Sequence, residues 1–183
     1  MIKQESSKLN KLPKIKSLKN NCFTILGTIL EYTSNLNKRS PSEFDNNSNI
    51  NGSCSALDNY DFEDLFKFCI KMLKISDNIL VLIMMYIDKI IANRKFIVCN
   101  ENVNKLFYTC LMITQKYYED NSLNNKTYAD LVGINYDDLL KLEMEFMNLV
   151  NFELFIKEED FQQYKQKINQ FFSNYNLSKK DEI

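Results

Sequence analysis

The chain has 183 residues, the size of one globular domain with tails, and its 23 basic and 24 acidic side chains leave a formal net charge of −1. That balance supplies no global positive field, so we expect no nucleic-acid partner. The sequence has no His and only three Gly, placed far apart, which excludes imidazole catalysis, His-containing metal sites and glycine-rich phosphate loops, so we expect no catalytic residue, no metal and no cofactor.

The cysteines and the apolar runs bear on the compartment. The five Cys form no Cys-x-x-Cys pair, which is typical of reduced thiols inside the cell, so we expect the protein in the nucleus and/or cytoplasm. The longest apolar run, 79–87, is shorter than the ~18–20 residues that cross a bilayer, and the N-terminus lacks an apolar signal core. We therefore expect no membrane segment.

The N-terminal part of the chain divides into three segments. Residues 1–17 carry scattered Lys among polar neighbours and predict a disordered, solvated tail. Apolar residues then recur at helical spacing from Leu18 to Leu30 and predict an N-terminal amphipathic helix over 18–36. Residues 37–59 are rich in Asn and Ser and have no period, so they predict a low-complexity loop that tethers this helix to the core.

The segment 60–173 predicts helix after helix and no strand, and hence an all-α fold. The second of these helices is apolar nearly all round between Ile79 and Ile91, so it must be central. Ser76 and Asn135 are expected N-caps, and Gly133 is an expected left-handed stop. The predicted helices begin near 60, 77, 100, 127, 136 and 158, the third ends near 118, the fourth near 132 and the last near 173, and a tail follows over 174–183.

Two acidic residues stand out from the helical pattern. Asp88 lies in the most apolar helix, where an unpaired carboxylate is costly, so we expect it to have a basic partner. Glu143 lies three and four residues from apolar neighbours, which indicates an interaction surface rather than the polar back of a helix. The alternative for Glu143 is a carboxylate at the edge of its helix that reaches water. The other paired carboxylates are interpreted as helix-end charges and solvated faces.

Several short stretches together resemble one known family. Tyr-Ile-Asp-Lys over 86–89 is similar to the family's Tyr-Ile-Asp-Arg, and Lys-Tyr-Tyr-Glu-Asp over 116–120 is similar to its Lys-Phe-x-Asp-Asp. Further matching stretches lie at 102–106, 124–129, 133–134, 142–146 and 151–154. In this order and at this spacing they resemble the cyclin box, specifically that of the P/U-type cyclins of the phosphate-response class.

The resemblance implies a single five-helix cyclin box over 60–173, with a central third helix and with flanking N- and C-terminal helices. It also implies a non-catalytic regulatory subunit that binds and activates a cyclin-dependent protein kinase as a heterodimer. The alternatives are a helical adaptor with a cyclin fold that does not activate a kinase, a cyclin-fold nucleic-acid factor, and an enzyme. Co-purification of a kinase separates the cyclin interpretation from the adaptor.

Residues for the kinase contact follow from the same resemblance. In cyclin–kinase complexes a basic residue of the third box helix and a Glu of the fifth contact the kinase near its mobile helix. The Glu is Glu143. An ungapped count from the 116–120 stretch places the basic position at Asn102, whereas the basic residue present is Lys105, one turn further on, and both stay open. The implied apolar contacts are Met147, Phe152 and Leu154.

A structural ion pair is implied as well. Related cyclins carry Arg at the position of Lys67 in the first box helix. The resemblance therefore pairs Lys67 with Asp88 across the core. Removing one partner of a buried pair of this kind typically costs about 3–5 kcal/mol.

Overall fold

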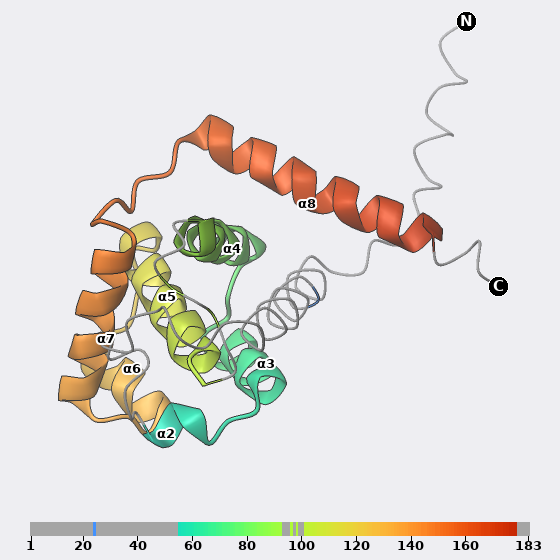
Figure 1. The fold of residues 1–183 in the computed structure, drawn as a ribbon. Coiled ribbons are helices and arrows are strands. Elements are labelled where there is room, and N and C mark those ends of the chain that lie inside the picture. The colour runs from blue at the N-terminus through green and yellow to red at the C-terminus, as the bar shows by residue number, and fades with distance from the viewer. Residues whose placement is uncertain (1–23, 25–54, 93–95, 97, 99–100, 179–183) are drawn as a thin grey trace, which may run out of the picture.

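The computed structural model describes Thr24 and residues 55–92, 96, 98 and 101–178 (Figure 1). No strand occurs among these described residues, and the predicted all-α fold is confirmed. In chain order the helices are α2 (Ser55–Asp58), α3 (Phe62–Met72), α4 (Asp77–Ala92), α5 (Val103–Tyr118), α6 (Asn125–Val132), α7 (Tyr136–Leu149) and α8 (Glu158–Ser178).

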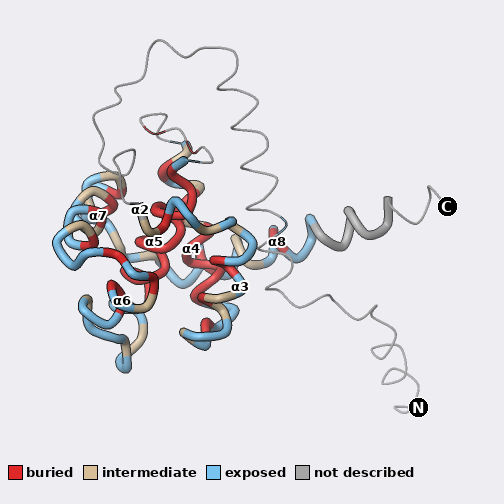
Figure 2. Tube along the Cα trace, turned by 90° about the horizontal axis from the view of Figure 1, so that it is seen from below, coloured by how far each residue is buried: buried red, intermediate tan, exposed pale blue. Residues whose placement is uncertain are grey.

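Helix α5 is the centre of the fold, with the other helices arranged around it (Figures 1 and 2). Every residue from Val103 to Gln115 is buried, because α2, α3, α4 and α7 all pack on this helix. A buried hydroxyl needs a hydrogen-bond partner, and Thr114 Oγ1 donates to the Cys110 carbonyl one turn earlier, at 2.6 Å. The third box helix is therefore the central one, as the resemblance implies.

Helix α4 lies between α5 and α8 (Figure 1). Its residues from Ile79 to Met84 are all buried, which explains why the sequence is apolar nearly all round there. Helix α8 crosses α4 and buries Phe161 and Ile168, which are two turns apart on one face. It ends at Ser178, beyond the end predicted near residue 173.

Caps set the ends of the shorter helices. The side chains of Ser76, Asn124 and Asn135 each accept a hydrogen bond from a backbone N–H of the helical turn that follows. Gly133 ends α6 with a φ of 71°, in the left-handed region where Gly carries no Cβ penalty. The caps at Ser76 and Asn135 and the stop at Gly133 are confirmed, and the cap at Asn124 starts α6 at Asn125 rather than near 127.

Several predicted segments lie wholly or largely outside the described residues. They are the tail over 1–17, the helix over 18–36 except Thr24, and most of the loop over 37–59. At the end of that predicted loop the structure has a single helical turn, α2, which contacts α5. A turn of four residues carries too short a pattern to be distinguished from a loop by periodicity.

Candidate interaction surface

A charged cluster joins the C-terminal end of α5 to α6 and α7. The Lys116 ammonium forms an ion pair with the Glu143 carboxylate and donates to Asn125 Oδ1 at 2.8 Å. The Asn125 amide in turn donates to the other Glu143 oxygen at 2.7 Å. The side chains of Lys116 and Glu143 remain 31% and 23% exposed. Three helices therefore hold one partly desolvated ion pair in a fixed geometry, with one side open to a partner.

The two candidates for the basic contact lie at the opposite end of α5. Asn102 is 1% exposed and Lys105 is 2% exposed, and the Lys105 ammonium pairs with Asp58 of α2 at 2.8 Å. The structure brings neither residue to Glu143 and buries both, and the kinase contact implied for them stays a prediction that this burial disfavours. Helix α2 covers this end of α5, and its Asp58 carboxylate neutralises the charge of Lys105. The basic residue beside Glu143 is Lys116, which the sequence analysis did not select.

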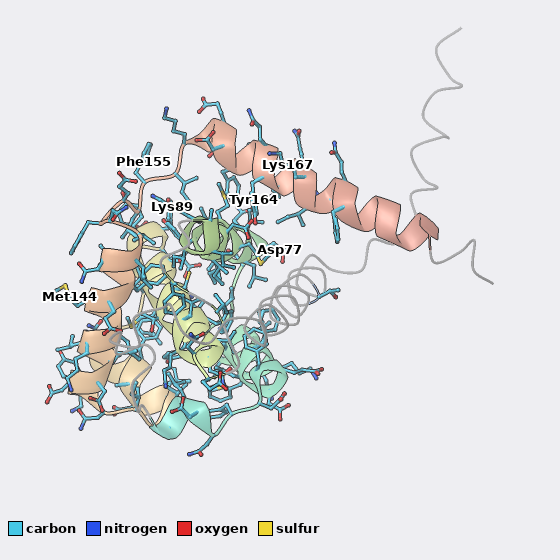
Figure 3. All side chains as sticks on the ribbon, in the orientation of Figure 1. Asp77, Lys89, Met144, Phe155, Tyr164 and Lys167 are labelled. Carbon is cyan, nitrogen blue, oxygen red and sulfur yellow. The ribbon has the colours of Figure 1, made fainter. Side chains whose placement is uncertain are left out.

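Exposed apolar side chains lie on the same helix as Glu143. On α7, Tyr136, Leu140 and Met144 recur every four residues and are 46%, 38% and 56% exposed. Figure 3 shows Met144 directed away from the core. The implied contact residue Met147 lies on the same side of α7 and packs partly against the core. Large apolar side chains rarely stay exposed in a row without a role, so this stripe extends the candidate surface along α7.

The α7–α8 connection, residues 150–157, presents two further aromatic side chains. Phe152 is 59% exposed and Phe155 is 73% exposed, whereas Leu154 between them packs partly against the core. The structure therefore exposes Phe152 and Phe155 and turns Leu154 partly inward. The kinase contacts that the resemblance implies for Phe152 and Leu154 stay predictions. No helical period exists in this connection, so the sequence could not show which of its side chains point outward.

The backbone of the connection is unusual at Asn151 and Phe152, where φ is 54° and 57°. The left-handed region costs an L-residue about 1–2 kcal/mol. Part of that cost is offset by a 2.7 Å hydrogen bond from the Phe152 N–H to the Met147 carbonyl. Lys89 of α4 also pairs with Glu153 at 2.7 Å and lowers the pKa of that carboxyl.

Asp88 and Lys67 do not pair, and the predicted structural ion pair is wrong. Lys67 lies on the exposed side of α3 and bonds to Glu63 one turn earlier at 2.5 Å, which raises the pKa of Lys67. Asp88 instead accepts a 2.5 Å hydrogen bond from the Tyr164 hydroxyl of α8. Figure 3 shows Tyr164 on the side of α8 that faces α4. Burial raises the pKa of the Asp88 carboxyl, and the hydrogen bond from Tyr164 opposes that shift.

A pocket of about 280 Å³ lies between the start of α4, the end of α5 and the start of α8. Its lining residues include Tyr118, Ile156, Glu119 and Glu158. Within the part of the chain that the structure describes, no group of three or more acidic or Cys side chains could hold a metal ion. No helix there has the length and apolar character to cross a membrane.

Comparison with known proteins gives one consistent result. The sequence matches the cyclin family over residues 8–154. It is 35% identical to cyclin-U2-2 of Arabidopsis thaliana over 92 residues, which are 50% of this chain and 40% of that protein. It is 29% identical to cyclin-U2-1 of the same plant over 112 residues, 61% of this chain and 50% of that protein. It is 25% identical to PHO85 cyclin-7 of Saccharomyces cerevisiae over 124 residues, 61% of this chain and 42% of that protein.

The chain thus spans half or less of the length of these curated relatives. The family match itself covers most of the chain, from the N-terminal segment to the α7–α8 connection. The helix order and the central α5 agree with the five-helix box that the motifs predict. The chain belongs to the cyclin family, and its relatives identify it as a P/U-type cyclin.

Proposed function

We propose that the chain is a non-catalytic regulatory subunit that binds and activates a cyclin-dependent protein kinase, as one half of a heterodimer. Its membership in the cyclin family and its similarity to yeast proteins named PHO85 cyclins support this function. The observation that carries the proposal is the ion pair between Lys116 and Glu143, held by Asn125 and bordered by exposed apolar side chains.

Such a surface suits a protein partner. Protein interfaces combine a few central anchors with a rim that excludes water. The apolar side chains of α7 and of the α7–α8 connection supply contact area. The charged cluster fixes the register, because its partly desolvated groups still have hydrogen-bonding capacity on the open side. We assign the contact to Glu143 and Lys116, with Met147, Phe152 and Leu154 as apolar contacts and Met144 beside them.

Activation needs no chemistry from the cyclin. A protein kinase is active only when the Lys–Glu pair of its mobile helix and its metal-binding Asp are both in place. A rigid partner that binds this arrangement better than the inactive one shifts the population toward it. The surface proposed here is rigid because each of its three polar groups comes from a different helix of one packed core.

The first experiment identifies the partner. The full chain carrying an affinity tag is used as bait in extract from its own cells, and captured proteins are identified by mass spectrometry. We expect a protein kinase of the cyclin-dependent class at roughly equal stoichiometry, and we expect its phosphotransferase activity to rise on addition of the chain. If the captured proteins include no such kinase, the adaptor interpretation replaces this proposal.

Charge reversal at Glu143 then locates the surface. In Glu143→Lys a cation faces both Lys116 and the site on the kinase that the carboxylate contacts. Loss of a desolvated charge contact typically costs about 2–5 kcal/mol, or roughly 30- to several-thousand-fold in affinity. The variant is expected to stay folded by circular dichroism and to lose both kinase binding and activation.

Asp64→Lys is the matched control for this reversal. Asp64 is an exposed acidic residue of α3, on a different part of the molecule from α7 (Figure 1). Its reversal changes the net charge by the same amount, so a general electrostatic effect on binding appears in both variants. If kinase binding survives Glu143→Lys but is lost in Asp64→Lys, the interface lies on the side of α3, and the surface proposed at α7 is wrong.

A further inference from the structure

Two tyrosine hydroxyl groups, one from α4 and one from α5, form hydrogen bonds with the backbone of the α7–α8 connection. The Tyr118 hydroxyl donates to the Leu154 carbonyl at 2.9 Å and accepts from the Ile156 N–H at 3.2 Å. The Tyr86 hydroxyl of α4 donates to the same Leu154 carbonyl. The two hydroxyl oxygens lie 3.5 Å apart. One end of the connection is therefore tied to α4 and α5 through side chains rather than through a helix or a sheet.

Packing supports this connection on one side only, since Val150 is buried and Leu154 and Ile156 pack partly against the core. Ile156 and Tyr118 both line the pocket of about 280 Å³ at the start of α8. Phe155, between the two residues that Tyr118 binds, is 73% exposed. Phe152, which precedes Leu154 in the connection, holds its left-handed conformation and is 59% exposed. A segment with an unfavourable backbone and two exposed aromatic side chains depends on specific hydrogen bonds, in addition to this packing, to keep one conformation.

We propose that Tyr118 is a positioning residue for partner binding: its hydroxyl fixes the α7–α8 connection so that Phe152 and Phe155 face the partner as paired aromatic anchors. Phe155 is thereby a further contact residue for the kinase. This inference rests on the proposed function. Tyr118 stands at the x of the family stretch Lys-Phe-x-Asp-Asp, so the resemblance itself implies no hydroxyl here. We call the two hydrogen bonds of the Tyr118 hydroxyl, to the Leu154 carbonyl and from the Ile156 N–H, the clamp.

The physical reason lies in the entropy of binding. An aromatic side chain on a loose segment must be ordered when the partner binds, and that ordering weakens the complex. A segment already fixed in the bound conformation avoids the loss. Aromatic anchors contribute most when they are rigid before contact, since they have few rotatable bonds of their own.

Tyr118→Phe is the decisive variant, because it deletes one hydroxyl and keeps the ring. The Leu154 carbonyl keeps its bond from Tyr86, and the bond from the Ile156 N–H is a solvent-exposed one that water can replace, so the fold is expected to keep its melting temperature. Hydrogen–deuterium exchange of the full chain alone is expected to speed up about tenfold over residues 153–157 and to stay unchanged in α4 and α7. With the kinase recovered by the tagged chain, the dissociation constant is expected to rise about 3- to 10-fold.

A double-mutant cycle separates positioning from a merely structural role. Phe155→Ala alone is expected to weaken kinase binding at least 5-fold. In Tyr118→Phe/Phe155→Ala the fold-loss in kinase affinity is expected to be smaller than the product of the two single losses, because the Phe155 ring is no longer there for Tyr118 to position. Tyr60→Phe is the matched control. It removes a phenol hydroxyl from the α2–α3 connection, away from the proposed surface, and should match the parent in exchange and affinity.

The outcomes distinguish this inference from the proposed function. Unchanged exchange in Tyr118→Phe shows that no clamp exists and overturns the inference, while kinase binding by the parent chain still stands. Faster exchange with unchanged affinity, or independent losses in the cycle, shows that the clamp does not serve binding and overturns it as well. If the parent chain binds no kinase, the proposed function fails, and the positioning role falls with it even where exchange reveals the clamp.

Discussion

The two ends of α5 carry the same kind of ion pair in two different settings. At the N-terminal end Lys105 is 3% exposed in its side chain and pairs with Asp58 of α2. At the C-terminal end Lys116 is 31% exposed and pairs with Glu143 of α7. The first pair closes the core against a short helix, whereas the second is open on one side. Exposure, and not residue type, decides which pair is available to a partner.

Neighbouring polar groups reinforce the difference. At the closed end the Asn104 amide donates to two backbone carbonyls, of Leu57 and Tyr60, at 3.0 and 2.7 Å, and ties α2 and the residues after it to α5. At the open end Asn125 bonds to both members of the ion pair and leaves them at the surface. One Asn therefore serves folding and the other orients a candidate contact.

The largest expected effect comes from breaking the closed end. Asp58→Ala removes the carboxylate that balances the buried Lys105 charge, and loss of one partner of such a pair typically costs about 3–5 kcal/mol. For a chain of this size we expect a fall in melting temperature of roughly 6–20 °C. Thermal and urea unfolding followed by circular dichroism measure it.

A second substitution checks the cause of that loss. Adding Lys105→Met to Asp58→Ala replaces the pair by an apolar contact of similar length, which is often neutral or stabilising. We expect the double variant to regain most of the lost stability and to bind the kinase like the parent. If the double variant is no more stable than Asp58→Ala, the buried charge is not what destabilises the single variant.

A smaller effect, and one on binding rather than folding, is expected at the open end. Lys116→Ala removes a cation that is already partly solvated, so we expect the unfolding free energy to fall by about 1 kcal/mol or less. The same change is expected to weaken kinase binding about 10- to 100-fold, because the cluster then presents an unbalanced carboxylate. Isothermal titration with the purified kinase measures the affinity.

Exchange of the two charges sharpens this test. In Lys116→Glu/Glu143→Lys the ion pair is restored within the chain, so we expect stability close to that of the parent. The kinase, however, meets each charge at the position of the other, and binding is expected to stay weak. Recovery of binding together with stability would mean that the pair serves the fold at this end too.

The same comparison explains what could be predicted from the sequence. The helices, the caps at Ser76 and Asn135 and the stop at Gly133 follow from local chemistry, and the structure has them. Glu143 is predicted to lie on an interaction surface because its apolar neighbours lie on its own helix, and its contact with a partner stays a prediction. Features set within one helix were therefore accessible, together with the all-α class that they imply.

Which Lys of α5 lies beside Glu143, Lys105 or Lys116, could not be predicted from the pattern within one helix. They are 11 residues apart, and at about 100° per residue this is roughly 20° more than three full turns, so both lie on the same face of α5. Periodicity cannot separate two residues of one face. Only the packing of α2 at one end and of α6 and α7 at the other decides which Lys is buried with a structural partner.

The predicted partner of Asp88 was wrong for a related reason. Its burial predicted a partner, and the sequence suggested a cation, but a hydroxyl can also satisfy a carboxylate. Tyr164 belongs to the apolar face of α8 by its spacing, and its hydroxyl reaches Asp88 only because α8 crosses α4. A contact between residues so far apart in the chain depends on how two helices cross, which no local pattern contains.

The smallest expected effect is at Asp88, whose carboxylate is compared with the carboxylates of the two ion pairs at the ends of α5. Asp88 is partly buried and has a hydroxyl partner in place of a cation, and burial raises its pKa above the ordinary value of 3.8. The folded chain then holds this proton more tightly than the unfolded chain, so the contribution of Asp88 to stability is present below pH 3.8 and is lost as the pH rises through the folded-state pKa. Asp88→Asn keeps an acceptor for Tyr164 and removes the charge.

We therefore expect Asp88→Asn to melt about 1–2 °C above the parent at pH 7, a fraction of a kcal/mol, and at the same temperature as the parent near pH 3. An acid held by an ion pair behaves in the opposite way, since a nearby cation favours its charged form and neutralising it weakens the fold at pH 7. Asp64→Asn on the exposed side of α3 controls for the general loss of one negative charge. A variant that melts below the parent at pH 7 would show that Asp88 has a cationic partner after all. The Lys105–Asp58 pair would then not be the only buried ion pair among the described residues.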